Sequence, residues 1–180
     1  LSTELCAGGP GRLSPRGHRP PWPAARVRRM MKTFETLADL AACVGQPVAV
    51  SDWITITQEQ VNRFADATGD HQWIHLDEER ARSGPFGGTI AHGFLTLSLV
   101  PAFFDASIAI GDLRMGVNYG LNKVRFTAPV PAGSRVRGRL RLRHTEAIAG
   151  GEQALWDVTV EREGGDKPAC VAEMLVRYYR

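Results

Sequence analysis

The sequence predicts an α+β fold in which an antiparallel sheet packs against one buried helix. Three observations support this prediction. The segment GFLTLSLVPAFF, residues 93–104, is apolar on all sides, as in a helix enclosed by other structure. Over residues 135–179 apolar and polar side chains alternate with a period of two, as in strands with one buried face. Helical patterns come first and strands follow, which is the order expected of an α+β domain.

The chain is long enough for one domain preceded by a tail. Of its 180 residues, 43% are hydrophobic, which is enough for one well-buried core but not for two full domains. We expect a single domain over residues 31–180. Residues 1–30 mix Pro, Gly and Arg without periodicity, so we expect a disordered tail there. We interpret this tail as sequence translated upstream of a start at Met30 or Met31, with an Arg-rich transit peptide as the alternative.

Charge, hydropathy and cysteine content exclude several classes of protein. The formal net charge is +3, but residues 1–30 contribute +5 and the remainder −2. A mildly acidic body cannot neutralise phosphates, so no nucleic-acid partner is predicted. No apolar run reaches the roughly eighteen residues of a membrane span, so no membrane partner is predicted and we expect a soluble protein. The three cysteines lack CxxC spacing, which argues against disulfides and zinc knuckles and favours the cytoplasm.

The first half of the chain predicts short elements before the buried helix. A helix is predicted over residues 34–44, capped by Gly45, because four apolar residues fall on one face: Phe34, Leu37, Leu40 and Ala41. The segment VAVSDWITIT, residues 48–57, is a candidate strand. Pro101 is expected to kink the buried helix or to split its last turn.

A better-defined helix follows the candidate strand. Thr57 and Gln60 have the spacing of a capping box, which opens a helix. Its apolar face comprises Val61, Phe64 and Ala65. Gly69 ends the helix, so Asp70 is predicted to be the first residue beyond its terminus.

The second half of the chain predicts about four long antiparallel strands. They are expected at residues 117–130, 135–144, 154–163 and 169–179, with a turn at GGDKP between the last two. In the second strand the polar positions are five arginines, Arg135, Arg137, Arg139, Arg141 and Arg143. We interpret them as a solvated face that also discourages edge pairing.

The stretch GDHQWIHLD, residues 69–77, carries the candidate chemistry. Asp70 and His75 are separated by four residues in a segment that starts where the helix ends, so their side chains can converge. An imidazole transfers protons near neutral pH, and a carboxylate can orient it or share the proton transfer. At the start of the buried helix, Gly93 offers an unpaired N–H and, lacking a Cβ, admits a carbonyl oxygen closely. This set suits addition or removal of water at an unsaturated thioester, with neither metal nor organic cofactor.

Each of these residues also has an alternative role. An Asp/His pair in a loop can serve only as turn and capping chemistry. His92 can be a satisfied structural histidine, and Asp77 can be the N-cap of a following helix. His71 and Trp73 can lie at the surface, in the core or in a pocket. A metal site is the remaining alternative, although the potential ligands match no zinc spacing such as HExxH: Asp70, His71, His75 and Asp77.

The segment FADATGDHQWIHLDEERARSGPFGGTIAHGFLTLSL, residues 64–99, resembles the hydratase signature of the MaoC-like dehydratases, the (R)-specific enoyl-CoA hydratases. DHQWIH and the later NYGLNKVRFTAPVPAGSRV are most similar to the branch with nodulation protein N and mycobacterial 3-hydroxyacyl-thioester dehydratases. The likeness covers residues 31–180. Its specific part is the Asp-x4-His pattern combined with AHG.

The resemblance implies a hot-dog fold, in which an antiparallel sheet wraps a long central helix, paired into a homodimer. It implies that Asp70 and His75 activate water and that the Gly93 N–H binds the thioester carbonyl of an acyl-CoA substrate. His92, directly before Gly93, is expected to take part in binding the substrate. The expected product is an (R)-3-hydroxyacyl thioester. Two departures stand out: Gln72-Trp73 replaces the Asn-Pro of many members, and Pro101 replaces a serine found in some.

Two rival functions follow from the same resemblance. A hot-dog thioesterase needs a base or nucleophile, which several such enzymes place as a carboxylate on the central helix. Residues 93–104 contain no acid, which disfavours this function. A non-catalytic acyl-thioester-binding module would keep the pocket but would have no need for an Asp/His pair.

Overall fold

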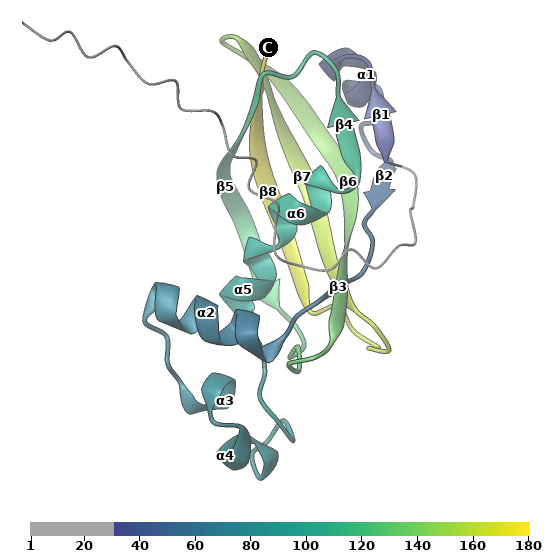
Figure 1. The fold of residues 1–180 in the computed structure, drawn as a ribbon. Helices are drawn as coiled ribbons and strands as arrows, with labels where there is room; N and C mark the ends of the chain where they lie inside the picture. The colour runs from purple at the N-terminus through teal and green to yellow at the C-terminus, as the bar shows by residue number, and fades with distance from the viewer. Residues whose placement is uncertain (1–30) are drawn as a thin grey trace, which may run out of the picture.

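The computed structural model describes residues 31–180, so the tail predicted over residues 1–30 lies outside the described residues. Its main element is a six-stranded sheet that curves around two helices (Figure 1). All of its strand pairs are antiparallel, as predicted. The order is β2 (Pro47–Val50), β6 (Arg135–Ile148), β7 (Gly151–Arg162), β8 (Cys170–Tyr179) and β5 (Met115–Phe126), and β3 (Ile54–Thr55) also pairs with β6.

The buried helix is split in two, as Pro101 predicted. Helix α5 (Gly93–Ser98) ends before Leu99, and α6 (Val100–Asp105) continues to the sheet centre. A proline lacks the N–H that would bond to the preceding turn, so the hydrogen-bond ladder is interrupted there. The expectation that this segment is enclosed on all sides is wrong at its start, because the Phe94 side chain is 67% exposed.

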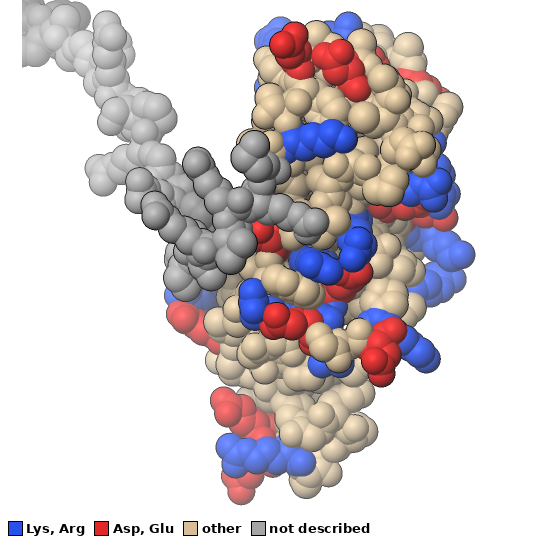
Figure 2. All heavy atoms as spheres, turned by 90° about the vertical axis from the view of Figure 1, so that its right-hand side faces the viewer, with Lys and Arg blue, Asp and Glu red and all other residues tan. Residues whose placement is uncertain are grey.

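Strand β6 shows how the alternating sequence fixes which face of the sheet is buried. Val136, Gly138, Leu140 and Leu142 point to the core, while the arginines between them point outward. Gly138 has no side chain because Phe103 of α6 fills that space. Four of the five outward arginines form ion pairs, namely Arg135–Glu163, Arg137–Glu161, Arg139–Glu161, Arg143–Asp157 and Arg143–Glu173. Figure 2 shows basic and acidic side chains interspersed on the side of the molecule that it presents.

The N-terminal elements are shorter than predicted. The helix expected over residues 34–44 is α1 (Leu37–Ala41), since Thr36 caps it and Phe34 belongs to strand β1 (Lys32–Phe34). Strand β1 pairs in parallel with β4 (Ile108–Ile110). Together they form a small second sheet that the sequence did not predict. The strand expected over residues 48–57 is interrupted between β2 and β3, where the Ser51 hydroxyl accepts a hydrogen bond from the Gly138 N–H.

Three helices form a separate layer at the lower end of the sheet (Figure 1): α2 (Gln58–Thr68), α3 (Trp73–Leu76) and α4 (Glu78–Arg82). The Thr57–Gln60 capping box opens α2, and Gly69 ends it in the left-handed conformation with φ of 78°, as predicted. Among residues 31–180, no helix is long and apolar enough to cross a membrane.

Candidate active site

The stretch from Gly69 to Asp77 is more ordered than the expected loop. Gly69 reverses the chain, Asp70 follows with its side chain exposed, and His75 lies in the single turn of α3. The His75 side chain is only 6% exposed. Asp70 and His75 are therefore joined by a turn and one helical turn, and not by the irregular loop that the sequence predicted.

Hydrogen bonding fixes the tautomer of His75. Its Nδ1 lies 2.7 Å from the Ile90 carbonyl oxygen, which can only accept, so Nδ1 carries the proton and donates it. The Nε2 atom is left with its lone pair. Burial lowers the pKa of His75 below 6.5, and the nearby His92 lowers it further, against the Ile90 hydrogen bond and the Asp70 charge, which raise it. His75 is therefore a neutral imidazole at pH 7, able to accept a proton at Nε2.

His92, which immediately precedes α5, lies against this imidazole. The two rings stack with their centroids 3.7 Å apart. The Nε2 of His92 donates a hydrogen bond to the backbone carbonyl oxygen of Asp70, at 2.9 Å. The ring is 2% exposed, and within residues 31–180 its Nδ1 has no hydrogen-bond partner.

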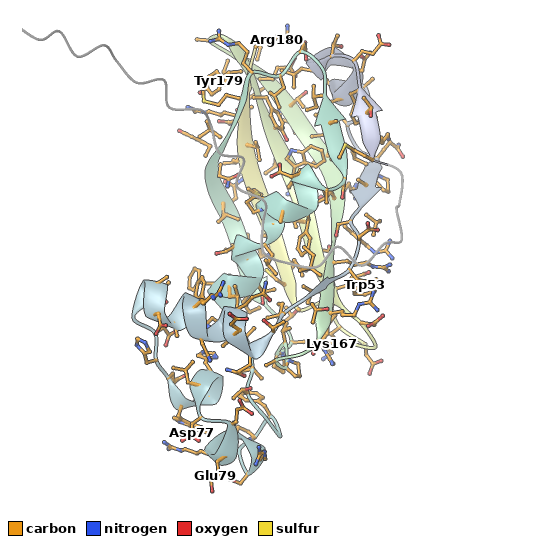
Figure 3. The ribbon with its side chains drawn as sticks, viewed as in Figure 1. Trp53, Asp77, Glu79, Lys167, Tyr179 and Arg180 are labelled. Carbon is orange, nitrogen blue, oxygen red and sulfur yellow. The ribbon has the colours of Figure 1, made fainter. Side chains whose placement is uncertain are left out.

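The structure brings three of the polar side chains together. One ligand atom each from Asp70, His75 and His92 lies within 4.8 Å of the other two. The four-residue ligand set that the sequence offered for a metal is not assembled. His71 pairs with Asp66 at the surface, and Asp77 caps α4 at the outer end of the helical layer (Figure 3).

The structure decides the roles of Trp73 and Asp77, which the sequence had left open. Trp73 is half-buried, with the Arg80 guanidinium stacked over its ring at 4.2 Å, so it packs against α4. Asp77 accepts a hydrogen bond from the Arg80 N–H, which confirms its role as an N-cap.

Gly93, which follows His92 in the chain, lines a cavity of about 260 Å³ whose walls include none of Asp70, His75 and His92. The walls are mainly apolar. They come from the segment before α5, from α5, from the end of β5 and the residues after it, and from the residue before β8: Phe86, Ile90, Ala91, Gly93, Thr96, Phe126, Thr127, Ala128, Pro129, Val130 and Ala169. The Phe126 ring covers Gly93 so closely that a Cβ there would lie 2.8 Å from its nearest ring atom. Only glycine fits at this position without displacing the ring.

Gln58 is a site residue that the sequence analysis missed. Its side-chain amide donates to the His75 carbonyl oxygen at 2.7 Å, and its side-chain oxygen accepts from the Thr89 hydroxyl at 2.5 Å. It thereby joins the start of α2 to both sides of the cluster. A glutamine next to a helix N-cap gives no sequence signal for this role, because both partners are distant in the chain.

Comparison with known proteins identifies the family of this chain. The family model of the MaoC-like domain matches residues 39–164. The chain is 60% identical over 149 residues to 3-hydroxyacyl-thioester dehydratase Z of Mycobacterium tuberculosis, covering 82% of this chain and 99% of that protein. The chain belongs to the MaoC-like dehydratase family. This membership confirms the sequence-based assignment and the expected enzyme class, a hydro-lyase.

Two further comparisons place the MaoC-like chain within its family and fold. Nodulation protein N of Rhizobium leguminosarum is 49% identical over 145 residues, covering 78% of this chain and 89% of that protein. The solved structure of an (R)-hydratase from A. caviae superposes with a TM-score of 0.61 at 22% identity, covering 74% of this chain and 94% of that one. The fold is the predicted hot-dog fold.

Proposed function

We propose that this protein catalyses the reversible hydration of trans-2-enoyl thioesters to (R)-3-hydroxyacyl thioesters, with acyl-CoA as substrate. The observation that carries the proposal is the convergence of Asp70, His75 and His92, the last of which directly precedes the cavity-lining Gly93, in a chain of the MaoC-like family. His92 links the Asp70 and His75 pair to the cavity, since it stacks on His75 and directly precedes Gly93.

The chemistry follows from the state of each group. In the hydration direction, Asp70 and the Nε2 of His75 hold one water molecule and remove its proton as it attacks the β-carbon. Negative charge then develops on the thioester oxygen, and the Gly93 N–H donates a hydrogen bond to it. The protonated base then returns that proton to the α-carbon, which restores the thioester and leaves Asp70 and His75 in their starting states. The residues themselves supply the base, the proton donor and the oxyanion donor, so the proposal includes no cofactor.

The apolar cavity suits the acyl part of such a substrate. Its lining includes Phe86, Ile90 and Phe126 around the glycine that would hold the thioester oxygen. An acyl chain placed there would remove apolar surface from water, which favours binding by about 0.8 kcal/mol for each buried methylene.

The test is to follow loss of enoyl-thioester absorbance in Asp70→Asn and His75→Asn. Each variant should lower turnover at least about a hundredfold, the low end for a positioned acid or base. His71→Asn is the matched control, because His71 lies in the same turn but faces Asp66 at the surface. Wild-type turnover in either Asp70→Asn or His75→Asn would refute the assignment.

The same assay separates the rival functions. Thiol release from a saturated acyl thioester, without loss of enoyl absorbance, would identify a thioesterase. The helix pair contributes one acid, the exposed Asp105 at the end of α6, and this position does not favour hydrolysis. Binding of an acyl thioester without either reaction would indicate a non-catalytic module.

We further propose that two copies pair along β5. Within the described residues β5 pairs only with β8, so its other edge is open. Long apolar edge strands invite pairing with another chain, and four large apolar side chains of β5 are exposed: Met115, Val117, Tyr119 and Leu121. Light scattering should give twice the monomer mass, and Val117→Lys with Leu121→Lys should reduce it to the monomer mass. A monomeric wild-type protein would refute this assembly.

A further inference from the structure

His92 is buried without satisfying its own hydrogen-bonding capacity. Its Nε2 bonds to the Asp70 carbonyl oxygen, but its buried Nδ1 has no partner among residues 31–180. Burying a polar nitrogen without a partner costs about 1–3 kcal/mol. An apolar ring at this position would avoid that cost. The retained imidazole therefore points to a role for the bond that it does make.

That bond links the two chain segments of the site at a specific place. Ile90 and His75 already join them, through the Ile90 N–H to Ile74 and the His75 Nδ1–H to the Ile90 carbonyl. Both of these bonds anchor the His75 side of the cluster. Asp70 is five residues earlier, and the hydrogen bond from His92 is the one that joins it to residues 89–93 within the described chain.

The ring of His92 also constrains the second catalytic group. One face stacks on His75 at a centroid distance of 3.7 Å, and Phe64 of α2 packs beside the ring at 5.0 Å. His92 is thus held between α2 and α3. Because its side chain is 2% exposed, a bound substrate would not reach it.

We propose that His92 is a positioning residue, whose Nε2–H fixes the peptide of Asp70 and whose ring fixes the plane of His75. It sets the distance between the two groups that hold the water and does not itself touch the substrate. This assignment rests on the proposed hydration, and it replaces the sequence-based expectation that His92 binds substrate. A misplacement of about 1 Å in such a site can cost a hundredfold in rate.

Two variants separate the hydrogen bond from the ring. His92→Phe keeps the ring over His75 but removes the donor to Asp70. His92→Gln removes the ring but places an amide N–H near the position of Nε2. We expect His92→Phe to lower kcat about ten- to a hundredfold with little change in KM. His92→Gln should recover part of this loss, because it restores the donor to Asp70 but not the ring over His75.

A pH profile provides a readout that a purely structural role would not move. The titratable groups facing His75 are Asp70, from its own segment, and His92, from the segment before α5; the charge of His92 lowers the pKa of His75. Removing the second imidazole should raise that pKa in both variants. The acid limb of kcat/KM should then move to higher pH in both, and an NMR titration of His75 should move in the same direction.

Three outcomes would overturn the proposal. They are wild-type kcat in His92→Phe, equal loss in both variants, and an unmoved His75 titration in both. If His92→Phe fails to fold, the kcat and the NMR titration of His92→Gln still decide. The titration requires no turnover, so it tests the contact between His92 and His75 even if the wild-type protein shows no hydratase activity, which would refute only the proposed function.

Discussion

Replacing Gly93 by alanine tests the contact between this glycine, the proposed oxyanion donor, and Phe126. A Cβ at this position would lie 2.8 Å from Cδ2, 2.9 Å from Cγ and 3.0 Å from Cε2 of the ring. Because Cγ sits on the ring axis, rotation of the ring about its own axis cannot relieve the clash, and the whole side chain has to swing away. Phe126 is 43% exposed, so it can move toward solvent.

The expected loss of stability in Gly93→Ala depends on how freely the Phe126 side chain can move away. Overpacking a well-packed site costs about 1–3 kcal/mol, and a partly exposed ring places this site at the low end. A loss of about 1 kcal/mol lowers Tm by roughly 2–4 °C in a domain of this size. The displaced ring also changes the approach to the Gly93 N–H, so we expect kcat to fall about tenfold.

A double-mutant cycle with Phe126→Ala isolates the steric contribution. In the Phe126→Ala background, Gly93→Ala should cost almost nothing in stability, since the atoms that it would meet are gone. Gly88→Ala is the matched control, because a Cβ at Gly88 would meet no atom within 4 Å. Thermal unfolding and steady-state kinetics of the four variants provide the measurements. An equal loss of stability from Gly93→Ala with and without Phe126 would refute the steric argument.

Three further predictions follow from the fold and the site. Gly138→Ala would place a Cβ 2.8 Å from the fully buried Phe103, so the free energy of unfolding should fall by about 3 kcal/mol, the upper end for overpacking, and an unchanged denaturant midpoint would contradict the packing of α6 on β6. Because the folded pKa of His75 lies below its ordinary 6.5, the unfolded chain takes up a proton first, and stability should fall as the pH drops from 6.5 through the folded pKa. Urea unfolding of the wild-type protein and of His75→Gln should show this fall only in the former. Incubation with EDTA should leave hydratase activity unchanged, whereas loss of activity that added zinc restores would assign Asp70, His75 and His92 to a metal.

Much of the fold followed from short-range patterns in the sequence. The alternation in β6 identified its buried face, since successive side chains of a strand point to opposite sides. The Thr57–Gln60 box and Gly69 bounded α2 correctly, because both caps act within three or four residues. Pro101 interrupted the buried helix as expected. The prediction failed at Phe34, where pairing of β1 with a strand more than seventy residues away outweighed a weak helical pattern.

The candidate site also has features that short sequence patterns predict and features that depend on tertiary contacts. The sequence by itself determined the Asp70 and His75 pair, the glycine at the start of α5 and the family, because these depend on residue types at short, fixed spacing. Only the tertiary structure decided that His92 bonds to Asp70 across 22 residues, that Ile90 sets the tautomer of His75 across 15, and that Phe126 covers Gly93. Such contacts form between segments that meet only when the sheet closes around α5 and α6, so no local pattern encodes them.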